Sequence, residues 1–533
     1  MSYLRSYVEH VAKVARDLED RVTLNSGGKE VYKVSDLEQL RRFLFLGTEK
    51  GSYYVSEKQL TITNVTCLER LLKDEDNHDT IVALFGEYAR KAFKKDYLIF
   101  ALARTCSYGD EKLRKRAYDL LPVVCGIPTH LFAFVESYKR CSKEFNGSTG
   151  WNALHKRSLR KWFLSKPRQD LAYQMTKYNH RNGWTQKDLI RLIHIKPADE
   201  CDDELLRYFV KETIPSDPPK SPALEFLVDY EAVKRSTDKD YVIEKVKRWN
   251  LAWEHVPTQF MKDADVMNAL ATKMPMVALL RNLNRLTALG VFEKFPETLD
   301  TVLAKLTFEK TIVHPLQFLI ALKMYAQGQG DLGSLVWEPL PTITERLNKA
   351  FYASFNSVEP TNKRFLVAMD VSGSMSCGNV CGIRCMNAAE VSCAFAMVLM
   401  SVEPCCDVMG FSHEFKRLPI SHTDPLETNL QKISGIAFGS TDISLPMTWA
   451  MANDKDYDVI VVLTDNETNC NAISPAKALR QYRTHVGHGC KLVVIATCAN
   501  EFTVADPSDR DMLDCAGFDA STPDVIREFV MTA

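Results

Sequence analysis

Apolar residues recur with helical spacing from Ser35 to about Val358, and polar residues or proline interrupt the pattern at short intervals. Helix-starting residues such as Asp79, Asp96 and Pro128 precede apolar segments about 16 residues apart, so helix pairs repeat at about twice that spacing. Such a repeat is typical of stacked αα-arrays, which bury a continuous core and leave a broad surface for a large ligand. We therefore predict a degenerate helical-repeat array, with an irregular globular helical domain as the alternative.

The last third of the chain has a different pattern, in which short continuous apolar runs alternate with helical segments. Continuous runs indicate strands covered on both faces, and their alternation with helices indicates a doubly wound, mostly parallel α/β sheet. The expected strands are 364–370, 405–411, 458–464 and 490–497, and the expected helices are 387–401, 442–452, 475–485 and 523–531. We thus predict a loosely ordered segment at 1–30, a helical domain at 31–360 and an α/β domain at 361–533.

The first strand of the α/β domain ends at a carboxylate that two hydroxyls follow, in the pattern Asp370-x-Ser372-x-Ser374. Open α/β sheets bind ligands beyond the carboxyl ends of their strands, where these side chains would lie. Another apolar strand ends at Asp465, and Thr441 lies in a glycine-containing loop between the two. Because Mg²⁺ prefers oxygen ligands in an open, roughly octahedral site, we predict a divalent metal site at these five residues, with Mg²⁺ as the expected ion.

A second stretch, from Trp151 to Lys196, is strongly basic in a chain whose net charge is only −1. It contains eleven Lys or Arg residues against two acids, and aromatic residues are interleaved with them. Cations neutralise phosphates and flat rings stack on unpaired bases, so this composition predicts contact with single-stranded nucleic acid. The alternative is a solvated helix face whose aromatic residues belong to the core. The candidate contact residues are Lys156, Arg160, Lys161, Lys177, Arg181, Arg191 and His194.

Local signals place two of these cations near the end of a helix. Lys177 and Arg181 are four residues apart, so we expect them on one helical face, with Gly183 closing that helix. Thr185 and Asp188 form a capping-box pattern that opens the next helix. The sequence therefore predicts a helix-turn-helix corner that projects cations at one rim.

The charge balance also divides the chain unevenly. Residues 361–533 carry 13 basic and 21 acidic residues, a net charge of about −8, whereas the preceding part carries 54 and 47, about +7. Such asymmetry indicates that the amino-terminal part meets an anionic partner.

Two family resemblances add to these interpretations. The order of Asp370, Ser372, Ser374, Thr441 and Asp465 resembles the metal-ion-dependent adhesion site (MIDAS) of von Willebrand factor A domains. The segment 176–197, with Asn-Gly-Trp at 182–184 and His-x-Lys-Pro at 194–197, resembles the TROVE proteins, the Ro/SS-A ribonucleoprotein family. This second resemblance covers nearly the whole chain after about residue 30.

The TROVE resemblance implies a ring of HEAT-like helical repeats followed by the A domain. It also implies that small noncoding Y RNA binds the outer surface of the ring and that single-stranded 3′ ends of misfolded noncoding RNAs enter the central cavity, as in RNA quality control. By the same resemblance, Lys177, Arg181 and His194 are RNA contacts.

We expect a cytoplasmic protein, with the nucleus as a second location, because there is no secretory signal and no long apolar run. Its thiols are then mostly reduced. Cys377, Cys381 and Cys385 recur every four residues, but no neighbouring His completes a zinc site, and their role stays open. We expect a monomer.

Three functions remain to be weighed. A noncatalytic RNA-binding protein uses both the basic stretch and the metal site. A protein-binding adaptor, whose metal takes a partner's carboxylate, leaves the basic stretch without a role. An enzyme is disfavoured, because Ser372 replaces the second Asp of haloacid dehalogenase phosphotransferases, and neither a hydrolase elbow nor a P-loop occurs.

Overall fold

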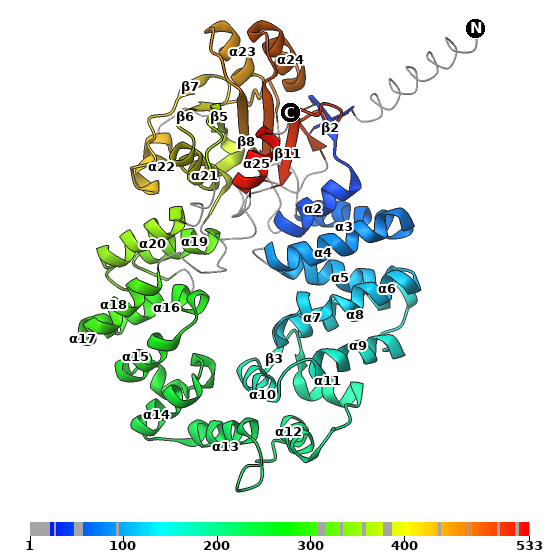
Figure 1. Cartoon of the computed structure of the whole chain (residues 1–533), viewed down its shortest axis with the longest axis vertical. Coiled ribbons are helices and arrows are strands. Elements are labelled where there is room, and N and C mark those ends of the chain that lie inside the picture. Colours follow the sequence, from blue (N-terminus) through cyan, green and yellow to red (C-terminus); the bar gives the residue numbers. More distant parts are fainter. Residues whose placement is uncertain are drawn as a thin grey trace. The chain divides into compact units, whose positions relative to one another are not determined.

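The computed structural model describes residues 22–25, 28–46, 57–91, 95–306, 315–330, 334–353, 359–376, 386–434, 439–466, 468–470, 472–497, 502–516 and 522–531 (Figure 1). The chain forms two compact units. The first, which we call the sheet unit, combines Met1–Leu71 with Phe351–Ala533, and the second, the helical unit, is Leu72–Ala350. Among the described residues, none of the helices has both the length and the apolar character that a membrane span requires.

The helical unit confirms the predicted all-α architecture (Figure 1). Its helices are α4 (His78–Lys91), α5 (Asp96–Tyr108), α6 (Glu111–Asp119), α7 (Leu121–Val124), α8 (Pro128–Asn146), α9 (Ala153–Leu164), α10 (Arg168–Lys177), α11 (Gln186–Ile193), α12 (Glu200–Lys211), α13 (Pro222–Arg235), α14 (Lys239–Trp249), α15 (Ala264–Lys273), α16 (Met276–Ala288), α17 (Val291–Lys294), α18 (Pro296–Lys305), α19 (Pro315–Ala326) and α20 (Pro341–Ala353). Short 3₁₀ turns, η2 (Trp253–His255) and η3 (Thr258–Lys262), connect α14 to α15.

Neighbouring helices of this unit bury their apolar faces against one another. Helix α5 packs on α8, α10 on α13, and α16 on α19, and the inward residues of these helices are fully buried. Caps fix several starts, as where the Asp110 side chain accepts a hydrogen bond from the Leu113 amide, 2.7 Å away. The predicted starts at Asp96 and Pro128 are the first residues of α5 and α8. Since a single amphipathic helix cannot bury its own face, the array is stable only as a stack.

The sheet unit contains a six-stranded sheet in the order β11-β9-β8-β5-β6-β7. All its pairs are parallel except β6 with β7. The strands are β5 (Arg364–Asp370), β6 (Cys405–Phe411), β7 (Phe415–Arg417), β8 (Val459–Thr464), β9 (Lys491–Ala496) and β11 (Met512–Ala516). The helices are α21 (Ala388–Val402), α22 (Leu426–Ser434), α23 (Leu445–Ala452), α24 (Pro475–Val486) and α25 (Thr522–Met531). This confirms the predicted doubly wound domain, and the four predicted strands agree to within one residue at each end.

The described part of the amino-terminal segment, residues 22–25 and 28–30, belongs to the sheet unit, whereas residues 1–21 and 26–27 of the segment predicted to be loosely ordered lie outside the described residues. Strands β1 (Val22–Leu24) and β2 (Glu30–Lys33) form an antiparallel sheet with β10 (Phe502–Thr503). Helix α2 (Asp36–Leu46) follows, and α3 (Glu57–Lys73) comes after it. The compact units therefore do not follow the predicted boundary at residue 31. Strands of two to four residues have no readable periodicity, so their long-range pairing escapes sequence analysis.

Buried polar contacts fasten this segment to the end of the chain. The side chain of Arg42 is fully buried, forms an ion pair with Asp514, and donates a hydrogen bond to the Phe502 carbonyl at 2.9 Å. The Asp514 carboxylate also accepts from the Thr503 hydroxyl at 2.6 Å. The Asn25 amide donates to the Thr468 carbonyl at 2.7 Å. These contacts make the early segment an integral part of the sheet unit.

Candidate nucleic-acid cavity and metal centre

The predicted corner around Lys177 and Arg181 is a helix followed by a β-hairpin. Helix α10 ends at Lys177, and the chain then forms β3 (His180–Arg181) and β4 (Trp184–Thr185), which pair antiparallel. Asn182 and Gly183 make the turn with φ angles of 52° and 78°. The prediction that both cations share one helical face was wrong, because an Asn-Gly pair favours a hairpin turn with two positive φ angles. The predicted capping box of α11 is confirmed.

Although they lie on different elements, Lys177 and Arg181 line the same cavity of the helical unit. We call this cavity of about 890 Å³ the large cavity. It is lined by α5, α8, α10, the hairpin, η2, α16 and α19, so residues far apart in the sequence meet there. Its charged residues are Lys95, Lys177, Arg181, Arg281 and Arg285 against Asp96 and Glu254. Five cations against two acids give the cavity a net positive charge, which suits an anionic ligand.

Aromatic rings accompany these cations. Trp253 is 40% exposed although it lines the large cavity, and the Arg285 guanidinium carbon lies 6.0 Å from the centre of its ring. The Lys177 ammonium lies 5.1 Å from the centre of the Tyr178 ring. Large exposed aromatic residues beside cations are the elements that single-strand-binding proteins use to stack bases and hold phosphates.

Several of these residues were missed by sequence reasoning. Arg281, Arg285 and Trp253 lie outside the basic stretch and carry no local signal, because only the curvature of the helical array brings them to the cavity. His130 also lines it, and its Nδ1 is buried with no hydrogen-bond partner among the described residues. Burial, together with the nearby Lys95 charge, lowers the pKa of His130 to about 4, so its imidazole is neutral near pH 7.

A second group of predicted RNA contacts lies elsewhere on the helical unit. Lys156 and Arg160 of α9 line a cavity of about 760 Å³ together with Arg157 and with Arg114 and Lys115 of α6. We call this the α6–α9 cleft. Nearby, Lys161 is exposed and forms an ion pair with Asp119 at 2.9 Å. The structure thus separates the basic stretch into distinct surfaces.

Arg191 belongs to a third surface, beside the hairpin. It lines a cavity of about 480 Å³ with Lys139, Trp184 and Gly183. The Lys139 ammonium lies 5.6 Å from the centre of the Trp184 ring, whose indole N–H donates to Glu136 at 2.9 Å.

His194, the last of the predicted RNA contacts, lies on the surface of the helical unit. It is exposed, has a positive φ of 52°, and ends α11 by donating its backbone N–H to the Ile190 carbonyl at 3.1 Å. The adjacent Ile193 carbonyl accepts a hydrogen bond from the Arg160 guanidinium at 2.5 Å. In the described part of the chain, His194 is not among the residues that line these three cavities.

The predicted metal ligands lie at the carboxyl edge of the six-stranded sheet. Asp370 ends β5, and its carboxylate accepts from the Ser372 amide at 2.9 Å and from the Thr464 hydroxyl at 2.9 Å. The Ser372 and Ser374 hydroxyls are 3.1 Å apart. Asp465 follows β8, the strand that pairs with β5. Four of the five predicted ligands thereby come from two neighbouring strand ends.

Thr441 reaches the same edge through its loop. The following residue, Asp442, donates its backbone N–H to the Ser412 carbonyl at 2.9 Å, and Ser412 directly follows β6, the other neighbour of β5. The Thr441 amide itself donates to the Asn469 side chain at 2.7 Å. All five predicted ligands are buried, and Thr441 is only 1% exposed.

The electrostatics of this edge fit a divalent cation. Burial and the nearby charge of Asp465 raise the pKa of Asp370 to about 7, because two carboxylates with little access to water destabilise each other's charged forms. A cation between them would remove that cost, and the three hydroxyls supply neutral oxygen ligands for an ion such as Mg²⁺. Within the described ranges, no cluster of three His, Cys, Asp or Glu side chains offers another metal site, and Cys377, Cys381 and Cys385 lie outside those ranges.

Comparisons with known proteins agree along almost the whole chain. The family model described as the TROVE domain matches residues 23–324, and the one described as the Ro60 vWA domain matches residues 364–530. The chain is 30% identical to "RNA-binding protein RO60" of Caenorhabditis elegans, over 98% of this chain and 92% of that protein. It is 34% identical to the protein of the same name from Deinococcus radiodurans, over 96% of both.

A solved structure shows the same arrangement of secondary structure. The crystal structure of the Deinococcus radiodurans Ro (RSR) protein covers 93% of this chain and 99% of its own, with a TM-score of 0.71 and 32% sequence identity. The helical repeats, the A-type sheet and the near-complete matches lead to one assignment: the chain belongs to the Ro60 family of TROVE-domain proteins.

Proposed function

We propose that the protein is a noncatalytic RNA-binding protein of a Ro ribonucleoprotein particle. The observation that carries this proposal is the large cavity, which gathers five cations and the exposed ring of Trp253 within the helical unit. Phosphates of a single strand pair with such cations, and its bases stack on such rings. The relatives named RNA-binding proteins support the same conclusion.

Within this proposal the two kinds of surface take different RNAs. The large cavity, with Lys177 and Arg181, takes the single-stranded 3′ end of a misfolded noncoding RNA. The α6–α9 cleft, with Lys156 and Arg160, and the nearby Lys161 contact a small folded Y RNA. Arg191, beside the hairpin, and the exposed His194 add contacts to the same RNA. The cleft has five cations and one acid, Glu111, which suits the phosphates of a duplex.

The metal site supports a second candidate function, the binding of a protein partner. Asp370, Ser372, Ser374, Thr441 and Asp465 hold a divalent ion, which we propose is Mg²⁺, and leave it further positions to fill. A carboxylate of a partner protein would fill one of them. The observation that favours this role is the buried carboxylate pair Asp370 and Asp465, which is not among the described residues that line the large cavity.

A salt titration of RNA binding tests the primary proposal. If about three phosphates of a single strand are neutralised in the large cavity, log K falls against log salt with a slope near −2, at about −0.7 for each contact. The double variant Lys177→Glu with Arg181→Glu loses two contacts, so its slope becomes shallower by about 1.4. Fluorescence anisotropy of an unstructured RNA oligomer measures both slopes.

A matched control is the double variant Lys187→Glu with Lys196→Glu. Both lysines are exposed in the same basic stretch but do not line the large cavity in the described chain, so the slope should stay near that of the wild type. If the wild type and both double variants have equal slopes, the large cavity is not the RNA site.

A further inference from the structure

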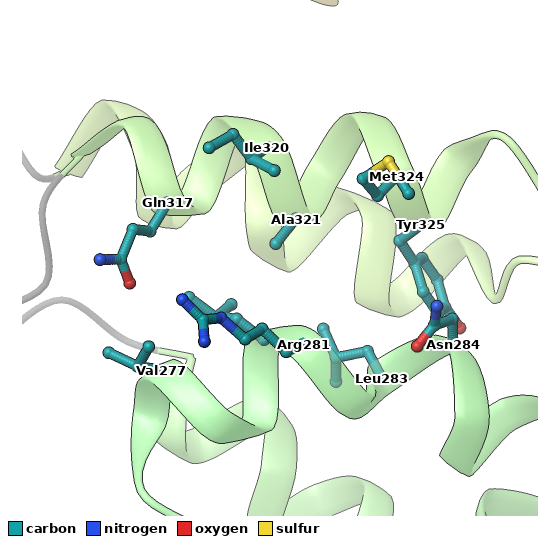
Figure 2. Close-up of a pocket in the computed structure, with 10 residues that line it drawn as sticks. Val277, Arg281, Leu283, Asn284, Gln317, Ile320, Ala321, Met324 and Tyr325 are labelled. Carbon is teal, nitrogen blue, oxygen red and sulfur yellow. The ribbon is translucent and has the colours of Figure 1, made fainter. Parts of the chain in front are cut away.

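A smaller cavity of about 260 Å³ lies between α16 and α19 (Figure 2). We call it the side pocket. Its walls are apolar, formed by Leu280 and Leu283 of α16 and by Ile320, Ala321 and Met324 of α19. In a helical array the facing sides of packed helices are normally filled by their own side chains. A hollow of this size between two packed helices is therefore a candidate binding site.

The side pocket is continuous with the large cavity. Val277, Arg281, Asn284 and Gln317 line both. In Figure 2 Arg281 and Gln317 lie toward one end of the side pocket, and Asn284 lies beside Tyr325 toward the other. A ligand of the large cavity thus has direct access to an apolar space, and it passes the Arg281 cation on the way.

The volume of the side pocket limits its occupant to about one ring system. An engineered apolar cavity of about 150 Å³ holds a benzene molecule, whereas sites for drug-sized ligands begin at roughly 300 Å³. At about 260 Å³ the side pocket lies between these limits. One heterocycle therefore fits, and a peptide side chain with its backbone or a lipid chain of ordinary length does not.

The polar groups of the side pocket suit the edge of such a heterocycle. Asn284 accepts the Arg285 backbone N–H on its carbonyl oxygen at 2.9 Å, which leaves its amide N–H groups to donate. Gln317 adds a second amide, with both a donor and an acceptor. The Tyr325 hydroxyl is already engaged, 2.8 Å from the Thr287 hydroxyl and 3.2 Å from the Leu340 amide, so Tyr325 offers its ring. Amide side chains and apolar walls are how proteins hold bases that have left a stack.

We propose that the side pocket takes one unpaired nucleobase of the RNA strand held in the large cavity, with Arg281 on the adjoining phosphate. This inference rests on the proposed function, because the large cavity must hold RNA for a base to reach the pocket. It adds a base-binding site to a surface whose other contacts are with phosphates and stacked rings.

The test compares a base-containing ligand with a base-free one. Ala321→Leu fills the side pocket, and Ala326→Leu makes the same change at an exposed position of the same helix. The probes are an oligouridine RNA and an abasic phosphodiester oligomer of the same length. Burial of one base contributes about 1–3 kcal/mol, so Ala321→Leu should weaken oligouridine binding about tenfold. It should leave the abasic oligomer unchanged, and Ala326→Leu should change neither.

Gln317→Leu is a second variant, at a half-exposed position, and it should also weaken only the base-containing probe. Gln317→Leu replaces Ala321→Leu in the test if Ala321→Leu lowers the melting temperature of the protein. If Ala321→Leu or Gln317→Leu affects both probes equally, or affects neither, the side pocket does not bind a base. The proposed function still stands in that case if RNA binding depends on salt as expected. Failure of the wild-type protein to bind either probe overturns both.

Discussion

The two candidate sites of this protein solve opposite electrostatic problems. In the helical unit, the large cavity collects cations around a wide space, and an anionic polymer would satisfy them. In the sheet unit, Asp370 and Asp465 are buried at one sheet edge, and a small cation would neutralise them. Each unit thus contains a concentration of charge that its ligand must neutralise. The two sites should therefore respond to different ions and fail independently.

The substitution with the greatest predicted effect lowers the stability of the sheet unit and leaves the large cavity unchanged. Arg42→Met removes one partner of a buried ion pair and leaves the Asp514 carboxylate, 12% exposed, without its cation. Breaking such a pair costs about 3–5 kcal/mol, so the free energy of unfolding of the sheet unit should fall by this amount. Chemical denaturation followed by circular dichroism measures the change.

RNA affinity supplies the control for this variant. Arg41→Met changes the neighbouring residue, which is exposed and pairs only with Glu38 among the described contacts, and it should cost less than about 1 kcal/mol. Arg42→Met should bind RNA as the wild type does at temperatures where both are folded. A parallel loss of RNA affinity would contradict the independence of the two units.

The next prediction concerns the effect of Mg²⁺ on the stability of the sheet unit. The wild-type protein should gain about 2.7 kcal/mol of stability when Mg²⁺ is present at a hundred times its dissociation constant. Asp370→Asn removes the repulsion between two buried carboxylates, so it should be more stable than the wild type without Mg²⁺ and gain nothing from the ion. Thermal unfolding with and without Mg²⁺ gives both values.

The matched control is Asp454→Asn, an exposed carboxylate of the same unit, which should keep the response to Mg²⁺. Were Asp370→Asn to retain the Mg²⁺ response, the five predicted ligands would not form the metal site.

The effect that is smallest near neutral pH concerns protons. Burial lowers the pKa of His155 to about 3, far below its unfolded value of 6.5. The folded helical unit therefore excludes a proton that the unfolded chain binds, and His155 contributes its full stability only above about pH 6.5. As the pH falls from 6.5 toward 3, that contribution is lost at up to about 1.4 kcal/mol per pH unit. His155→Gln should reduce the slope of stability against pH accordingly.

The matched control is His180→Gln, the same change at an exposed position of the helical unit. Urea denaturation at a series of pH values tests both variants. An unchanged slope for His155→Gln would show that protonation of His155 does not limit the acid stability of the helical unit.

Local sequence pattern predicted those parts of the structure that neighbouring residues determine. The strands that end at Asp370 and near Asp465 are uninterrupted apolar runs, so their place in the sheet was predicted correctly. That the side chains at their ends bind a metal stays a prediction. The capping box at Thr185 was recognised for the same reason. The resemblance to the TROVE family, carried by short motifs, was confirmed by the family matches.

Local sequence pattern did not predict the places where distant segments meet. The residues Arg281, Arg285 and Trp253 share the large cavity with Lys177 only because the helices curve, and nothing near them in sequence indicates this. The Asn182–Gly183 turn was interpreted as a helix stop because each residue also favours that role. Strand β10 has two residues, too few for any periodic signal.

The pairing of Arg42 with the Phe502 carbonyl has a consequence for how the protein is made. The two residues are 460 positions apart, and the ribosome adds about 5–20 residues each second. An emerging β2 therefore waits between roughly 20 and 90 s for its partner strand, and the whole of Leu72–Ala350 is translated in that interval. The helical unit is complete first, and any nascent-chain chaperone has this interval in which to shield the edge of β2 that later pairs with β10.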